Sequence, residues 1–159
     1  MPVEQGSLSL LDDPVAQGLL KSRNLAKLAY TWPDGTPRVV PIWFHWTGEE
    51  VVLGTPSNAP KVLALRENPA VALTIDDSEW PYKVLLLRGN ARLEPVEGVV
   101  PEYGLAARRY FGEEGGKNWV DNVRQMGDQV RVAIRLNWVG ILDFEQRFPS
   151  AIHDVITGA

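Results

Sequence analysis

The segment Val130-Arg131-Val132-Ala133-Ile134-Arg135-Leu136-Asn137-Trp138 carries the clearest structural pattern in this sequence. Hydrophobic residues occupy every second position, and the same parity continues through Leu142 and Phe144. Because the side chains of a β-strand point alternately to opposite faces, this period of two predicts a half-buried antiparallel strand. At about 15 residues it exceeds the usual strand length, so we expect a bulge at Asn137 or Gly140 that bends it around a barrel.

Shorter hydrophobic segments before this one predict the other strands of the same sheet. Pro33-Asp34-Gly35-Thr36-Pro37 is a strong turn sequence, so the hydrophobic runs on its two sides are expected to form a hairpin. Pro41 removes a backbone donor from the second run, which predicts an edge strand or an irregular ladder. The expected strands cover residues 24–32, 38–46, 51–53, 70–75, 84–93 and 130–144.

A few short helices are expected between these strands. Asp12 and Asp13 are cap candidates before Pro14, which predicts a helix over residues 11–22. Asn58 is expected to open a second helix that ends at Glu67. Residues 98–127 predict two helices separated by the glycines of 112–116. The fold class is therefore mainly β (α+β), with about six or seven antiparallel strands in one domain over residues 1–159.

Composition narrows the classes of function. The chain has 159 residues, 45% of them hydrophobic, and no cysteine, which excludes disulfides, thiolate nucleophiles and iron–sulfur sites and suits the cytoplasm. A net charge of −4 argues against nucleic-acid and anionic-membrane partners, since both favour a basic surface. No apolar segment approaches the roughly 20 residues that cross a bilayer. A small-molecule ligand is the expected partner.

Common catalytic motifs are absent from the sequence. The two histidines, His45 and His153, lack the spacing of a metal site, so no metal is expected. Neither GxSxG, GxxxxGK[ST] nor GxGxxG occurs, which argues against the usual hydrolase, phosphate-loop and Rossmann sites. No side chain is assigned as a catalytic acid or base.

The segment Gly54-Thr55-Pro56-Ser57-Asn58-Ala59-Pro60-Lys61 has the chemistry of a phosphate site. It lies between a predicted strand and a predicted helix, where backbone donors and the helix dipole favour an anion. The hydroxyls of Thr55 and Ser57 and the cation of Lys61 could converge on the same group. From local features alone, a capped helix with an exposed lysine is the favoured interpretation.

The order of segments resembles the pyridoxamine 5′-phosphate oxidase-like family of flavin-binding split β-barrels. The resemblance covers about residues 25–93: Arg38-Val39-Val40-Pro41-Ile42-Trp43, then Gly54-Thr55, then Lys61, then the strands at 70–75 and 84–93. It implies a six-stranded antiparallel split barrel and a homodimer that binds FMN, or the deazaflavin F420, across the subunit interface. It further implies that Arg38 and Lys61 hold the cofactor phosphate together with the Thr55 hydroxyl, and that Val39, Val40, Pro41 and Ile42 line the isoalloxazine ring.

Three departures from the family pattern bear on activity. Ala59 and Pro60 stand where the oxidase has Ser and Arg, and Trp43 stands where it has Lys. The C-terminal Arg-x-His pattern with which the oxidase holds its pyridoxal substrate is missing. We therefore do not expect oxidation of pyridoxamine phosphate. The resemblance implies an FMN-dependent oxidoreductase with a small organic substrate; an F420-dependent reductase and a non-catalytic flavin- or haem-binding protein are the alternatives.

Overall fold

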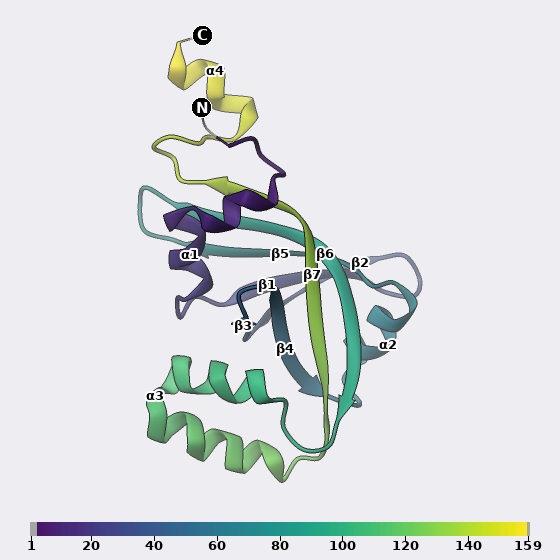
Figure 1. Cartoon of the computed structure of the whole chain (residues 1–159). Helices are drawn as coiled ribbons and strands as arrows, with labels where there is room; N and C mark the ends of the chain where they lie inside the picture. The colour runs from purple at the N-terminus through teal and green to yellow at the C-terminus, as the bar shows by residue number, and fades with distance from the viewer. Residues whose placement is uncertain (1–2, 159) are drawn as a thin grey trace.

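The computed structural model describes residues 3–158 as one curled antiparallel sheet with helices at its ends (Figure 1). Its strands follow the order β2-β1-β5-β6-β7-β4-β3, which forms a half-barrel. The strands are β1 (Ala26–Thr31), β2 (Pro37–Ile42), β3 (His45–Trp46), β4 (Glu50–Pro56), β5 (Ala70–Asp77), β6 (Lys83–Val96) and β7 (Gln129–Leu142). The helices are a 3-10 turn (Leu8–Asp12), α1 (Pro14–Leu20), α2 (Pro60–Glu67), α3 (Pro101–Arg124) and α4 (Ser150–Thr157).

The count of seven strands, rather than six, comes from the segment predicted as one strand over residues 38–46. The ladder of β2 ends at Ile42, and β3 then pairs with β4 instead of β1. Phe44, between them, is fully buried in the core. The predicted edge position of Pro41 is confirmed, because β2 is the terminal strand of the sheet.

The predicted bulge of the long strand is present at Asn137. In the pairing of β6 with β7, Arg88 lies opposite Trp138 and Gly89 lies opposite Leu136, so Asn137 has no partner residue. Gly89 is required there because a side chain at this position would overlap the carbonyl oxygen of Arg135. The two strands therefore approach closely at the bulge, which bends the sheet.

The prediction that even-numbered residues face the core along the whole long strand is wrong beyond the bulge. Up to Leu136 the even-numbered residues face the core, as expected, but Val139 and Ile141 are the fully buried residues after it. Trp138 and Leu142 point to the outer face and are partly exposed. The extra residue at Asn137 causes this reversal, since one inserted residue moves all later side chains to the opposite face.

The helices follow the sequence signals with three differences. Asp13 caps α1 by accepting a hydrogen bond from the Val15 amide at 2.9 Å, as predicted, but the helix is shorter than expected. Asn58 does not open α2, because the cap residue is Ala59 and no side chain makes the capping bond. Gly112 breaks α3 into the two expected helices with φ of 82°. The sequence analysis did not anticipate α4.

The main core lies between the inner face of the sheet and the helices α1 and α2. A smaller core, built on Val52, Val100 and Ala133, lies on the outer face of the sheet beneath α3. Figure 1 shows α3 and α4 at opposite ends of the molecule. None of the helices within residues 3–158 is long and apolar enough to cross a membrane.

Gly89→Ala should destabilise the protein by about 3 kcal/mol, because the new methyl group would collide with the backbone of Arg135. Gly18→Ala is the matched control: it lies in α1 with open space around it, and should stabilise by about 0.5–1 kcal/mol through helix propensity. Urea unfolding of both variants measures these changes. Equal stability of the two variants would contradict the close approach at the bulge.

Candidate functional site

The connection from β4 to α2 brings together three of the residues predicted to bind a phosphate. Thr55 is the penultimate residue of β4, Ser57 follows that strand, and Lys61 is the second residue of α2. The Ser57 amide donates to the Asp128 carbonyl at 3.2 Å, which fixes the connection against the segment before β7. The Ser57 side chain is exposed. The connection therefore has a fixed path and presents both hydroxyl and cationic groups.

The Thr55 hydroxyl is a buried polar group of this connection. The residue is 2% exposed, and within residues 3–158 its Oγ1 atom has no hydrogen-bond partner. A buried polar atom without a partner costs roughly 1–3 kcal/mol. A ligand that forms a hydrogen bond with the Thr55 hydroxyl would remove this cost.

Lys61 supplies a partly desolvated positive charge at the start of α2. Burial lowers the pKa of its ammonium group from the ordinary lysine value, because leaving water disfavours the charged form. An anion beside Lys61 would raise this pKa again, because the opposite charge favours the ammonium form. Thr55, Lys61 and the N-terminal end of α2 together fit a phosphate group, which is the part of FMN or F420 that the sequence analysis assigned to this segment.

Arg38 lies on the edge hairpin and contacts other groups. Its Nη1 atom donates to the Thr36 hydroxyl at 2.6 Å, and its guanidinium carbon lies 5.4 Å from the centre of the Trp32 ring. The Arg38 side chain is exposed. The structure thus places Thr55, Ser57 and Lys61 on one connection, from β4 to α2, and Arg38 at the turn end of β2 with its guanidinium over the Trp32 ring.

The remaining predicted residues are divided between the two faces of β2. Val39 is 66% exposed and Pro41 is also exposed, so both present apolar surface on the outer face. Val40 is partly buried and Ile42 is 9% exposed, and both pack with the main core. Only the backbone of these two residues is therefore available to a ligand on the outer face. The free edge of β2 also leaves backbone groups of alternate residues unpaired.

Five aromatic side chains next to β2, which sequence reasoning did not bring together, form what we call the aromatic wall: Trp43, Tyr103, Tyr110, Phe111 and Trp119. Trp43 stacks on Tyr110 with a centroid distance of 5.0 Å and an interplanar angle of 19°. Phe111 meets Trp43 edge-on, also at 5.0 Å. Tyr103 and Trp119 lie 5.5 Å and 6.2 Å from Trp43. The available signal was Trp43 itself, a large ring where the family pattern has a lysine.

His45 lies two residues beyond Trp43 and is partly buried. Burial and the nearby charge of Arg109 lower the pKa of its imidazole, while Glu102 opposes the shift. The Arg131 guanidinium in turn holds the pKa of Glu102 below its usual value, with Nε donating to Oε1 at 2.9 Å. This environment favours the neutral form of the His45 imidazole.

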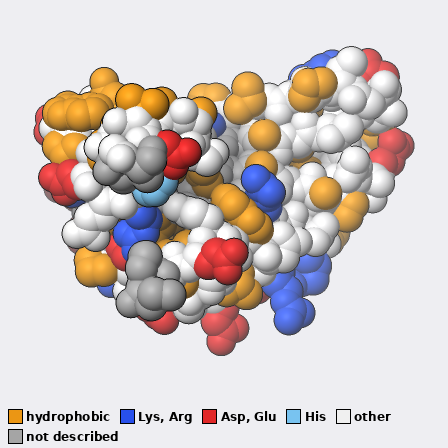
Figure 2. Space-filling model, turned by 90° about the horizontal axis from the view of Figure 1, so that it is seen from above, with side chains coloured by type: hydrophobic (Ala, Val, Ile, Leu, Met, Phe, Trp, Pro, Cys, Tyr) orange, Lys and Arg blue, Asp and Glu red, His pale blue; other side chains and the backbone are white. Residues whose placement is uncertain are grey.

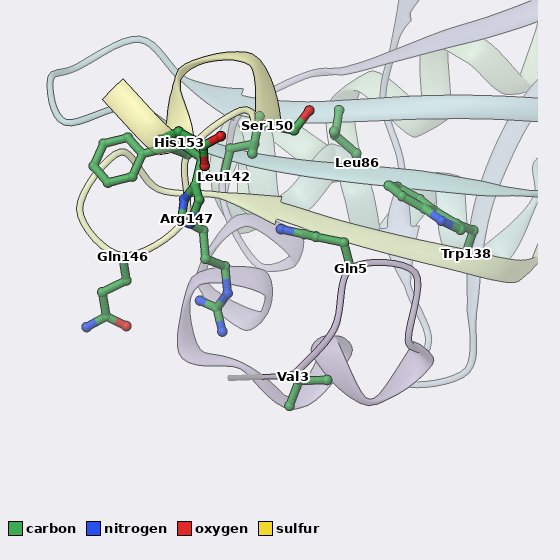
Figure 3. Close-up of a pocket in the computed structure, with 11 residues that line it drawn as sticks. Val3, Gln5, Leu86, Trp138, Leu142, Gln146, Arg147, Ser150 and His153 are labelled. Atoms are coloured by element: carbon green, nitrogen blue, oxygen red, sulfur yellow. The ribbon is translucent and has the colours of Figure 1, made fainter. Parts of the chain in front are cut away.

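A separate cavity of about 700 Å³ lies at the other end of the molecule, between the N-terminal segment, the outer face of β6 and β7, and α4 (Figure 3). Leu86, Trp138 and Leu142 form its apolar side, and Arg147 and His153 are among its polar residues. Viewed from above, this end of the molecule exposes many hydrophobic side chains (Figure 2). None of the sequence-predicted site residues lines this cavity.

Solved structures share this fold. An F420 reductase is 26% identical, with a TM-score of 0.58, and the match covers 77% of this chain and 93% of that one. A conserved hypothetical protein from Mycobacterium tuberculosis is 23% identical, with a TM-score of 0.65 and coverage of 87% and 86%. The haem storage protein HutZ from Vibrio cholerae is 20% identical, with a TM-score of 0.60 and coverage of 82% and 93%.

Sequence comparison assigns the family. A search of curated proteins finds no match to this chain. The family model for pyridoxamine 5′-phosphate oxidase, however, matches residues 13–142, which is most of the chain and includes the whole sheet. The suspected resemblance is thereby confirmed: the chain belongs to the pyridoxamine 5′-phosphate oxidase family.

Proposed function

We propose that this protein is an oxidoreductase that binds FMN, or alternatively F420, with the cofactor phosphate at the connection from β4 to α2. The observation that carries the proposal is the buried Thr55 hydroxyl at the end of β4, which has no hydrogen-bond partner in the described part of the chain, followed six positions later by the partly desolvated Lys61. A phosphate would accept from both groups. When bound, either cofactor supplies a ring that takes up and gives away electrons or hydride.

In this proposal the protein's own residues bind the cofactor and orient its ring. Lys61 and Thr55 hold the phosphate, and Arg38 adds a second cation after leaving Trp32. Val39 and Pro41 offer an apolar outer surface to one face of the ring, while the backbone of β2 contacts its edge. Binding of a dianion raises the pKa of Lys61 back toward its ordinary value, because the opposite charge favours the ammonium form.

The choice between FMN and F420 is left to experiment. Family membership supports FMN, and the likeness to an F420 reductase supports the deazaflavin. The visible spectrum of the purified protein and the mass of its released cofactor distinguish the two.

A non-catalytic flavin- or haem-binding protein is the second candidate. His45 favours it, since a neutral, partly buried imidazole is suited to bind iron. The fold that this chain shares with a haem storage protein is compatible with such a role. Turnover of the bound cofactor with NADPH or with reduced F420 supports the oxidoreductase, whereas haem binding that His45→Ala abolishes supports the alternative.

We further propose a homodimer in which the outer sheet face is covered. Trp80 is 68% exposed and Tyr82 is 42% exposed, and both pack with Phe144 beside the partly exposed Leu142. A cluster of exposed hydrophobic rings of this kind is typical of an interface. In this arrangement the cofactor site includes residues of both subunits.

Thr55→Val should weaken cofactor binding while leaving the free protein at least as stable as the wild type. The substitution removes a buried hydroxyl that has no hydrogen-bond partner among residues 3–158, so the free energy of unfolding should rise by about 1 kcal/mol. Loss of one phosphate contact should weaken affinity about tenfold. Urea unfolding and flavin titration measure the two effects, and Thr55→Ser, which keeps the hydroxyl, is the control. Destabilisation by Val would show that the hydroxyl already has a partner.

Lys61→Ala should weaken the binding of FMN and F420 by about tenfold to a hundredfold, because it removes a charge-assisted contact to the phosphate. Lys21→Ala is the control: Lys21 is an exposed residue at the end of α1, and its loss should leave affinity unchanged. Titration followed by flavin fluorescence and by F420 fluorescence gives both affinities. Equal affinity in wild type and Lys61→Ala for both cofactors would reject the site.

Separation of the subunits should lower cofactor affinity, because half of a shared site is lost. The interface should bury more than about 1,200 Å². Leu86→Lys places a charge on the outer sheet face and should promote dissociation, whereas Leu105→Lys, on α3, should not. Sedimentation over a dilution series, with flavin fluorescence in parallel, gives both quantities. A stable monomer with full cofactor affinity would refute the shared site.

A further inference from the structure

We propose that the aromatic wall selects a flat, uncharged ring as the substrate of the proposed cofactor site, in place of a phosphate ester. This inference rests on the proposed function, because the wall is a selective surface only if a cofactor lies along β2. It goes further than the proposed function because it names the chemical class of substrate that the aromatic wall can bind. Three properties of the wall support it: its position, its rigidity and the engagement of its polar groups.

The wall stands at the end of the apolar outer surface of β2. Buried Ile42 and Phe44 flank Trp43, whose ring therefore projects away from the core and meets the rings of α3. Val39 and Pro41 are exposed on the strand that leads to it. A substrate ring placed beyond the cofactor on β2 would meet Trp43 and Phe111, and Phe111 is 52% exposed.

The wall is held in place by polar contacts at its rim. The Trp119 indole N–H donates to the Tyr103 hydroxyl at 2.9 Å, and the Tyr110 hydroxyl donates to the Asn24 carbonyl at 3.2 Å. Trp43 is in ring contact with the four other members. Rings fixed in this way offer a preformed apolar surface, which binds a flat ring with little loss of conformational entropy.

Arg109, the charged group beside the wall, already holds two backbone carbonyls and an aromatic ring, which disfavours charged ligands. The Arg109 guanidinium donates to the carbonyls of Ser22 and Phe44 and lies 4.9 Å from the centre of the Tyr110 ring. A phosphate would have to compete with these two carbonyls for the guanidinium. A cation would be repelled by Arg109, which already occupies the electron-rich face of Tyr110. An uncharged ring meets neither obstacle.

Equilibrium dialysis of the cofactor-loaded protein with 2-naphthol and with pyridoxamine 5′-phosphate tests the inference. The wild type should bind 2-naphthol more tightly. Phe111→Ala should weaken 2-naphthol binding about tenfold, since it removes an exposed ring that contributes contact but little stability. Leu105→Ala, which changes an exposed hydrophobic residue of α3 outside the wall, should bind as the wild type does. Trp43→Lys should shift the preference toward pyridoxamine 5′-phosphate.

Cofactor titration of the same variants separates this inference from the proposed function. Phe111→Ala should retain full cofactor affinity, and circular dichroism should show a folded chain. A wild type that binds neither FMN nor F420 overturns the proposed function and this inference with it. Normal cofactor binding with unchanged 2-naphthol affinity in Phe111→Ala overturns this inference alone, as does a wild-type preference for pyridoxamine 5′-phosphate.

Discussion

The pairing of β6 with β7 across the bulge at Asn137 is the constraint on which the rest of the structure depends. Residues of β6 keep one parity along its length, so Leu85, Leu87 and Gly89 all face the core. β7 matches them only because Asn137 takes up one residue, which lets Leu136 and Val139 both point inward. Without this extra residue, one half of the strand would place its hydrophobic side chains in solvent.

Successive side chains of the neighbouring strand β4 point to opposite faces of the sheet. This alternation separates the proposed phosphate site from the aromatic wall. Thr55 faces the interior at the end of the half-barrel, near the start of α2. Gly54 faces outward, where a side chain would meet the Cβ of Tyr103 at 2.9 Å and Gln129 Oε1 at 2.8 Å. α3 can therefore rest directly on β4. Thr55 thus belongs to the proposed phosphate site, whereas its neighbour Gly54 supports the helix that carries four rings of the aromatic wall.

Local pattern was sufficient for most of the strands, for Pro41 at the edge and for the break at Gly112, because each depends on a residue and its immediate neighbours. It was not sufficient to separate β2 from β3, which pair with different strands. The reversal of parity after Asn137 could not be predicted, since it depends on the register with β6. The aromatic wall was missed because Trp43 and the rings of α3 are about 60 or more residues apart in the chain, and only the fold joins them. For α4, the spacing of Ile152, Val155 and Ile156 was an available helical signal.

Arg109 is one of several side chains that fasten α3 to the rest of the molecule, beside Tyr110 and Glu102. It donates to the carbonyls of Ser22 and Phe44, and its own carbonyl accepts from Arg23 Nε at 3.0 Å. α3 is inserted between β6 and β7, whose long ladder is complete without it. The helical hairpin is consequently an exchangeable module: a relative could lengthen, shorten or replace it while retaining the sheet, and protein engineers could recombine such hairpins on one barrel to change what the molecule recognises.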